Sequence, residues 1–107
     1  MKPIHWLGDS RKAIGAFPSA ARQAAGYQLF RVQSGLDPHD WKPMQSVGAG
    51  VREIRVHVDG EWRVLYLAAR PEAVYVLHAL RKKSRRTPAP DLALARERLK
   101  QLEAGRR

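Results

Sequence analysis

Apolar residues recur at helical spacing in two long stretches of the chain. Between residues 19 and 34, small and aliphatic side chains stand three or four positions apart, and Gly35 follows where a left-handed C-cap is expected. Residues 88–104 carry a second apolar stripe, preceded by Thr87 as a helix cap and followed by Gly105. The pattern therefore predicts one long helix in each half of the chain.

The N-terminus predicts a short strand and then a short helix. Asp9 or Ser10 is suited to cap a helix over 11–17, because either side chain can accept a hydrogen bond from the first turn. Pro18 ends this helix, since proline has no backbone donor. In residues 35–50 glycine, proline and aspartate interrupt any sustained period, so we expect a long irregular loop there.

Three strands are predicted in the second half of the chain. Two runs rich in β-branched residues, 51–58 and 62–67, flank the pair Asp59-Gly60 and predict a hairpin. Residues 73–80 are apolar at nearly every position, which is typical of a central strand covered on both faces. Together with the helices, these strands predict a compact α+β fold.

The register of the hairpin decides which side chains share a face of the sheet. A loop with an odd number of residues places Arg55, His57 and Arg63 on one face, opposite an apolar face that includes Tyr66. A two-residue turn would instead place Arg63 among aliphatic side chains. We favour the odd loop, with Gly60 at a positive φ, because it avoids burying an unpaired guanidinium.

The chain is short and strongly basic. Its 107 residues suit a single domain over 1–107, and 20 Lys and Arg against 10 Asp and Glu give a formal net charge of +10. This charge attracts polyanions, so nucleic acid is the expected partner. Because there is no cysteine, disulfides and thiolate chemistry are excluded. We find no signal peptide or membrane-spanning stretch, and therefore expect a cytoplasmic protein with no membrane partner.

A basic run follows the predicted central strand. Five of the six residues from 81 to 86 are cationic, namely Arg81, Lys82, Lys83, Arg85 and Arg86. A basic run at the end of a rigid strand suits a phosphate-binding edge, although a solvated surface loop would have the same composition. Repulsion between Lys82 and Lys83 can lower the pKa of one of them into a range useful for a base.

Candidate site residues also lie on the strands themselves. Arg55, His57 and Arg63 would repel one another unless they bind an anion or are neutralised by nearby carboxylates, for which Glu53, Asp59 and Glu61 are available. His78 can serve as an acid or base, or as a hydrogen-bonded core residue. Tyr66 can stack on a base or belong to the core. The histidines show no metal-ligand spacing, and no cofactor motif is present.

Several short stretches in fixed order resemble a known family. In the first half they are Trp6-Leu7-Gly8, Phe17-Pro18, Gly26-Tyr27, Gln33-Ser34-Gly35 and Lys42-Pro43. In the second half they are Gly50-Val51-Arg52-Glu53-Ile54-Arg55, Trp62-Arg63-Val64-Leu65-Tyr66, Tyr75-Val76-Leu77-His78-Ala79-Leu80, Lys82-Lys83-Ser84 and Thr87-Pro88. The chain resembles the phage-derived branch of the RelE/HigB-like toxins of bacterial type II toxin–antitoxin systems.

The resemblance implies a RelE-like α+β fold, in which N-terminal helices pack on a small curved antiparallel sheet that a C-terminal helix completes. It implies a ribosome-dependent endoribonuclease that cleaves mRNA without a metal, by attack of the 2′-hydroxyl on the adjacent phosphate, and so stops translation. The implied partners are mRNA, the ribosome and a helix-turn-helix antitoxin that forms a hetero-oligomer with the toxin.

Roles for individual residues follow from the same resemblance. The catalytic residues would be Arg55, Arg63, His78, Lys82 and Lys83, with the arginines as phosphate clamps, His78 as acid or base, and one lysine as a base. The RNA-binding residues would be Arg52, Tyr66, Arg81, Arg85 and Arg86, and Arg52 and Glu53 would orient the catalytic groups. Two alternatives are a gyrase-targeting toxin of the same superfamily and a non-catalytic module that binds nucleic acid or the antitoxin.

Overall fold

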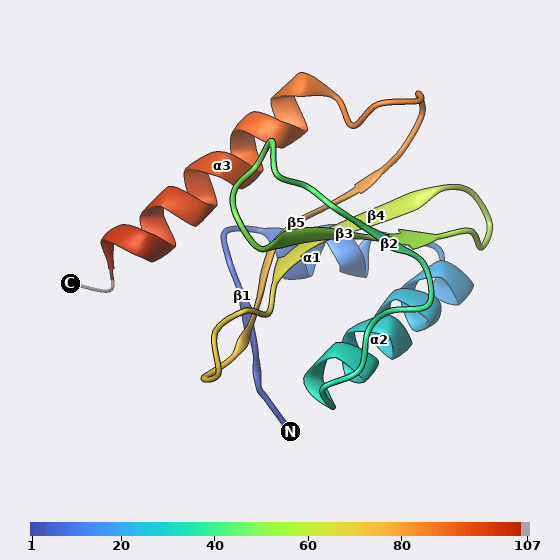
Figure 1. Ribbon diagram of the computed structural model, residues 1–107. Helices are drawn as coiled ribbons and strands as arrows, with labels where there is room; N and C mark the ends of the chain where they lie inside the picture. Colours follow the sequence, from blue (N-terminus) through green and yellow to red (C-terminus); the bar gives the residue numbers. More distant parts are fainter. Residues whose placement is uncertain (106–107) are drawn as a thin grey trace.

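A computed structural model describes residues 1–105 as an α+β fold around one five-stranded sheet (Figure 1). The strands are β1 (Ile4–Trp6), β2 (Trp41–Pro43), β3 (Val51–Val56), β4 (Trp62–Leu67) and β5 (Val74–Arg81). The helices are α1 (Ser10–Gly15), α2 (Ser19–Gln33) and α3 (Ala89–Ala104). The expected fold class, the long helices and the three central strands are thus confirmed within a few residues.

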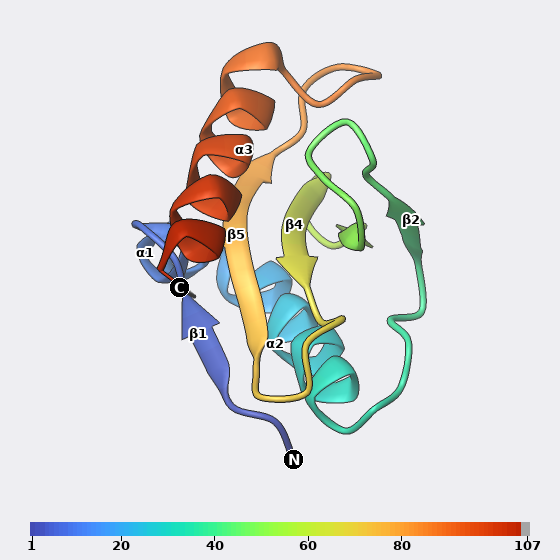
Figure 2. The same cartoon turned by 60° about the vertical axis from the view of Figure 1, so that its left-hand side comes forward.

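The order of strands across the sheet is β1-β5-β4-β3-β2, and Figure 2 shows β1, β5, β4 and β2 following one another in this order. Strand β5 lies between β1 and β4 and is buried along all but its last residue, as its continuous apolar run predicts. The sheet is not purely antiparallel, because β1 pairs with β5 in parallel. The resemblance-based expectation of an antiparallel sheet is corrected for this edge.

The region expected to be an irregular loop contains the short edge strand β2. Three residues, Trp41–Pro43, pair antiparallel with β3. Sequence periodicity could not reveal so short a strand, because three residues show no recognisable alternation. This strand brings Lys42 opposite Glu53.

The hairpin between β3 and β4 has the odd-numbered loop that we favoured. Arg55 pairs with Arg63 and Ile54 with Val64, so the charged and apolar side chains separate onto opposite faces. The loop spans residues 57–61, and Gly60 has a φ of 125°. The left-handed conformation of Gly35, with a φ of 84°, is also confirmed at the end of α2.

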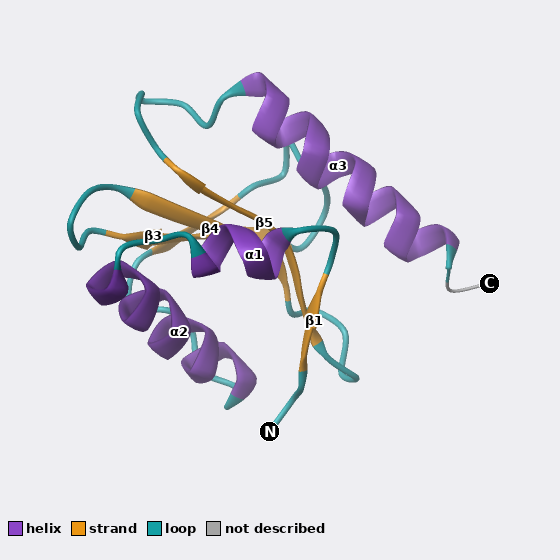
Figure 3. Cartoon of the chain, turned by 180° about the vertical axis from the view of Figure 1, so that it is seen from behind, coloured by secondary structure: helices purple, strands orange, loops and turns teal. Residues whose placement is uncertain are grey.

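Helices cover both faces of the sheet, which therefore has an apolar cluster on each side (Figure 3). Helices α1 and α2 pack on one face, and their cluster includes Leu29, Ile54, Val64 and Tyr66. Helix α3 packs on the other face through Leu99 and its neighbours on the predicted stripe. We call these the α2 face and the α3 face of the sheet.

Two helix caps differ from the predictions. The Thr87 side chain does not cap α3; the cap position is Pro88, and the Thr87 hydroxyl is bonded elsewhere. At α1, Asp9 occupies the cap position but makes no side-chain cap hydrogen bond, and Ser10 donates to the Val76 carbonyl oxygen. Both departures occur because tertiary partners compete for the capping side chains. The expected fraying of Arg106-Arg107 lies outside the described residues.

Candidate functional site on the α3 face

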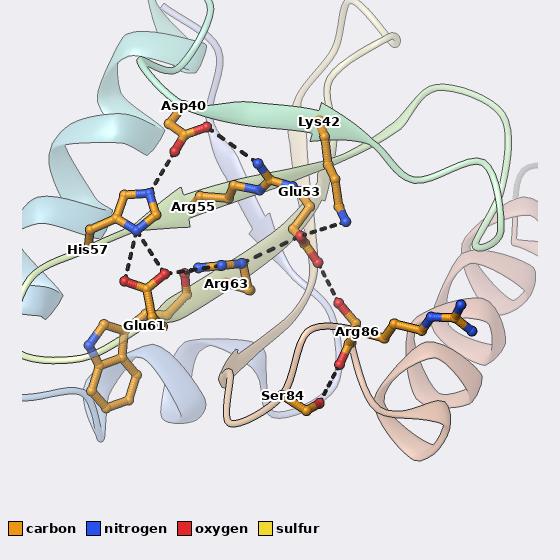
Figure 4. A network of polar contacts seen from close by, with 11 residues as sticks. Asp40, Lys42, Glu53, Arg55, His57, Glu61, Arg63, Ser84 and Arg86 are labelled. Carbon is orange, nitrogen blue, oxygen red and sulfur yellow. Dashed lines mark hydrogen bonds and ion pairs between the residues drawn. The ribbon is translucent and has the colours of Figure 1, made fainter.

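Cationic side chains from three neighbouring strands and the loop after β5 gather on the α3 face (Figure 4). Arg55 and Arg63 stand directly opposite each other on β3 and β4, and Lys42 stands opposite Glu53 on β2 and β3. Alternation along each strand forces these residues to one side. We call the group Lys42, Arg55, Arg63 and Lys82, with Glu53 at its base, the cationic site.

A buried carboxylate lies at the base of the cationic site. Glu53 is 0% exposed, and its Oε1 lies 3.6 Å from Arg63 Nε and 3.8 Å from Lys42 Nζ. Its other oxygen accepts a hydrogen bond of 2.7 Å from the Thr87 hydroxyl. A buried carboxylate persists only with such partners. Glu53, on β3, therefore contacts side chains from β2, β4 and the segment before α3.

The site retains hydrogen-bonding capacity that the described residues do not use. Arg55 Nε, Arg63 Nε and Glu53 Oε1 are buried and have no hydrogen-bond partner in residues 1–105. Buried polar groups in proteins are nearly always paired, so unpaired donors at one place indicate a functional or solvent-filled site. Arg63 Nε and Glu53 Oε1 face each other as an ion pair at 3.6 Å, whereas Arg55 Nε has no hydrogen-bond partner among the described residues. Guanidinium groups opposite each other match the acceptor oxygens of a phosphate.

Lys82 completes the site from the first residue after β5. Burial lowers the pKa of its ammonium, the nearby Arg63 guanidinium lowers it further, and Glu53 opposes the shift. The direction agrees with the expectation for one of the two lysines, but the first cause is burial rather than repulsion by Lys83. Lys82 also lines an open pocket of about 500 Å³ with Glu61, Arg63, Lys83, Ser84 and Arg85.

Carboxylates and a histidine border the cationic site at the hairpin end. His57 Nε2 lies 2.6 Å from Asp40 Oδ2, and His57 Nδ1 lies 2.8 Å from each Glu61 oxygen. These contacts, first with Asp40 and then with Glu61, raise the pKa of His57. Glu61 also lies 3.2 Å from Arg63, and Asp40 lies 4.0 Å from Arg55. Carboxylate neutralisation, the alternative left open by the sequence, thus accounts for part of this charge.

The carboxylates that neutralise the cations are not all those expected. Glu53 and Glu61 take part as anticipated, whereas Asp59 lies in the turn with a φ of 54°. Asp40 takes the place that Asp59 was expected to fill. It comes from the segment before β2, which the sequence did not assign to the sheet.

His78 lies between β5 and α3. It is 7% exposed, its Nε2 lies 2.6 Å from Asp91 Oδ1, and its Nδ1 lies 3.3 Å from Arg98 Nη1. The ring therefore joins β5 to α3, and its role as an acid or base stays a prediction.

Three predicted RNA-binding residues lie away from the cationic site. Tyr66 is 0% exposed in the α2-face cluster, so its ring cannot stack on a base, and burial raises the pKa of its hydroxyl. Arg52 pairs with Tyr66 across the strands and therefore shares the α2 face. Arg81 pairs with Trp62, and its guanidinium lies 5.6 Å from that ring, also on the α2 face. The residues that the resemblance assigns to RNA binding therefore do not form one common surface.

The rest of the basic run lies in the exposed loop between β5 and α3. Lys83, Arg85 and Arg86 are exposed, and the Ser84 hydroxyl donates to the Arg86 carbonyl oxygen at 2.8 Å (Figure 4). Lys83 and Arg85 line the pocket of the cationic site, whereas Arg86 is not among its lining residues. The predicted cations thus divide between the site, its rim and the opposite face.

Lys42 and Thr87 are site residues that the sequence analysis did not assign. Lys42 was noted only within a resembling stretch, and Thr87 only as a helix cap. A weak signal for Lys42 existed, because it is the one cation between residues 35 and 50 and adjoins a tryptophan. No sequence signal pairs Thr87 with Glu53, since 34 positions separate them.

The described residues contain no group of three His, Asp or Glu side chains placed to hold a metal ion. Within residues 1–105 no helix is both long and apolar enough to span a membrane. The fold and site define a small basic α+β protein with an arginine- and lysine-lined sheet face.

Comparison with known families agrees with this class. Residues 12–100 match the model of the family described as phage derived protein Gp49-like (DUF891). The chain therefore belongs to the Gp49-like family of phage-derived proteins, a toxin-like family related to RelE. The resembling stretch Trp6-Leu7-Gly8 precedes the matched residues. A search of curated proteins returned no match.

Proposed function

We propose that this protein is the toxin of a type II toxin–antitoxin system and cleaves mRNA in the cationic site. The observation that carries the proposal is the pair of opposed arginines, Arg55 and Arg63, which lie with Lys82 on one face of the sheet around the buried Glu53. Fixed cations that face one point stabilise the extra negative charge of a pentacoordinate phosphate. Membership of a toxin-like family supports the same activity.

The reaction is an intramolecular transesterification. The 2′-oxygen of the RNA attacks the adjacent phosphorus and loses its proton to a base, while the bond from phosphorus to the 5′-oxygen breaks. The 5′-oxygen takes up a proton, and the products are a 2′,3′-cyclic phosphate and a free 5′-hydroxyl. Arg55 and Arg63 would hold the non-bridging oxygens, because planar guanidinium groups suit this geometry.

The two neighbouring lysines have the properties for proton transfer. Lys82 is the proposed base, since burial and Arg63 lower the pKa of its amine and so raise its neutral fraction. Lys83 is exposed and lines the same pocket, and its ammonium is the proposed donor to the 5′-oxygen. Glu53 would act as a positioning residue, because it contacts Arg63 and is closed to solvent.

The biological setting follows from the family resemblance. The RNA would be mRNA on the translating ribosome, in the cytoplasm, and a helix-turn-helix antitoxin would bind and inhibit the toxin. The net charge of +10 supports a polyanionic target.

Induced expression in a bacterium, with pulse-labelling of protein and DNA synthesis, tests the proposal. The variant is Lys82→Ala, and the control is Lys12→Ala, which removes the same charge from an exposed position of α1. We expect protein synthesis to collapse with the wild type and with Lys12→Ala, and to continue with Lys82→Ala. An early fall in DNA synthesis would favour a gyrase-targeting toxin, and no effect on either would leave a non-catalytic binding module.

The RNA ends distinguish cleavage from other ways of stopping translation. Purified protein incubated with mRNA and ribosomes should produce fragments with a 2′,3′-cyclic phosphate and a 5′-hydroxyl. The same reaction without ribosomes tests the expected ribosome dependence. Fragments with a 5′-phosphate would contradict attack by the 2′-hydroxyl.

A further inference from the structure

A row of aromatic rings lies exposed on α2 and on the segment that leads to β2. Tyr27 and Phe30 are 52% and 49% exposed, and their ring centroids are 6.5 Å apart. The exposed His39 continues the row, with its ring centroid 6.0 Å from that of Tyr27. The interplanar angles are 34° and 32°, so each neighbouring pair of rings is tilted rather than perpendicular. Large apolar rings are normally buried, which makes this row unusual on a basic protein.

Two hydrogen bonds join His39 to helix α2. The segment from α2 to β2 runs back alongside the helix (Figure 1), and Gln28 fixes it there. The side-chain oxygen Oε1 of Gln28 accepts a hydrogen bond from the His39 backbone N–H at 2.8 Å, and Gln28 Nε2 lies 3.0 Å from His39 Nδ1. The position of the His39 ring relative to Tyr27 is therefore preorganised.

The edge strand connects this row with the cationic site. Asp40 and Lys42 point to the α3 face, where they lie close to Arg55 and Glu53. His39 and Trp41 alternate with them along the chain. On the α2 face the Arg52 guanidinium lies over the Trp41 ring, with its Cζ 3.9 Å from the ring centroid. Because β2 is the outermost strand, a chain bound in the cationic site can pass around it to the rings.

The helix that carries the row is basic. Helix α2 contains two cations, Arg22 and Arg31, and no carboxylate, and the one carboxylate between α2 and His39, Asp37, pairs with Arg52. Two half-exposed rings are too small to anchor a stable protein interface, which buries about 800 Å² on each partner. A single ring face is enough to stack one nucleobase, and such stacking tolerates any sequence.

We propose that Phe30, Tyr27 and His39 form a stacking platform for unpaired bases of the RNA strand whose phosphate occupies the cationic site. The strand would cross the β2 edge, with its backbone near Lys42 on one face and its bases on the rings of the other. The platform contributes affinity without reading a base sequence. The assignment of the RNA phosphate to the cationic site rests on the proposed function. The position of the stacking platform rests on the geometry of the rings.

Equilibrium binding to two polyanions tests the platform. The probes are a labelled oligoadenylate of about 12 nucleotides and inorganic polyphosphate of similar length, which has charge but no bases. The variant is Tyr27→Leu with Phe30→Leu, and Tyr27→Trp is the conservative rescue. Leu94→Ala is the control, because it alters an exposed apolar side chain on α3. Circular dichroism melting verifies that each variant is folded.

We expect the double variant to bind oligoadenylate about tenfold or more weakly and polyphosphate as the wild type does. Tyr27→Trp and Leu94→Ala should leave both affinities unchanged. Equal oligoadenylate binding by wild type and double variant would overturn the platform and leave the rings for a protein partner. A parallel loss of polyphosphate binding, or no oligoadenylate binding by the wild type, would overturn it as well.

The two proposals fail in different ways. Ring-dependent RNA binding without any arrest of translation would remove the toxin activity and leave the platform. If the wild type arrests translation but the double variant binds RNA equally well, the platform is excluded and the toxin activity stands.

Discussion

Glu53 illustrates how one residue sets the properties of its neighbours. Its carboxylate is closed to solvent and contacts Arg63, Lys42 and Thr87, which come from three different segments. Two cations around one buried anion give a net positive site without leaving the anion unpaired. The cations of the site are therefore partly compensated within the fold itself.

Glu53→Gln removes this charge and keeps the side-chain shape, including an acceptor for Thr87. We expect the free energy of unfolding to fall by about 1–3 kcal/mol, because Arg63 and Lys42 lose their shared counter-charge. Urea denaturation measures the change. Glu97→Gln, at an exposed position of α3, is the control and should shift stability by less than about 0.5 kcal/mol. Equal stability of the two variants would contradict a structural role for Glu53.

His57 makes stability depend on pH near neutrality. Asp40 and Glu61 raise its pKa in the folded protein above the ordinary 6.5, so folding favours the protonated ring. This contribution is complete below the unfolded pKa and is lost as the pH rises through the folded pKa. We expect Tm to fall over that window, modestly because the three side chains are half exposed. His57→Gln should remove the fall, and an identical pH profile in the variant would argue against it.

At the scale of elements, α3 is held to the sheet by a polar contact as well as by its apolar stripe. Arg98 is buried and donates to the Leu77 carbonyl oxygen at 2.9 Å and to Asp9 Oδ1 at 2.6 Å. This arginine also lowers the pKa of Asp9. The guanidinium passes under Gly8, where an added Cβ would lie 2.3 Å from Arg98 Nε. The start of α1, the centre of β5 and α3 thus meet at one side chain.

Substitution of two glycines should change the free energy of unfolding in opposite directions. Gly8→Ala should cost about 1–3 kcal/mol, because Gly8 has a φ of 54° and its Cβ would displace Arg98. Gly26→Ala, at an open position inside α2, should gain about 0.5–1 kcal/mol. Thermal or urea unfolding measures both. A Gly8→Ala protein as stable as the wild type would show that α3 tolerates a shift of Arg98.

At the scale of the whole molecule, charge is distributed over both faces of the sheet rather than concentrated on one. Arg55 and Arg63 face α3, whereas Arg52 and Arg81 face α2. The formal net charge of +10 favours long-range attraction of a polyanion, whereas the proposed binding of a phosphate depends on the geometry of the α3 face. The two contributions are therefore separable by experiment.

The salt dependence of RNA binding separates them. Lys82→Ala should reduce the slope of log K against log salt by about 0.7, the value for one phosphate contact with a single strand. Lys12→Ala removes the same net charge outside the cationic site and should leave the slope unchanged. Fluorescence anisotropy with an unstructured RNA at several salt concentrations measures both. Equal slopes for the two variants would mean that Lys82 contributes only general charge.

Local sequence features predicted much of the fold and part of the site. The hairpin register followed from Asp59-Gly60 and from the cost of burying an unpaired guanidinium, and it correctly placed Arg55 beside Arg63. Arg63 is nevertheless buried, at 5% exposed, and is paired there with Glu53 and Glu61. Helix α2 and its glycine cap followed from periodicity. Arg52 and Arg81 lie on the opposite face from Arg55 and Arg63, because strand alternation sends neighbours to opposite faces.

What the sequence determined by itself was the set of elements and the separation of charged from apolar positions, because periodicity and turn residues act over a few positions. The tertiary structure alone decided that β2 joins the sheet with Lys42, that Thr87 bonds to Glu53, and that His78 lies between Asp91 and Arg98. It also decided which aromatic rings stay exposed. These outcomes depend on contacts between residues far apart in the chain, whose geometry is set only when the helices pack on the sheet.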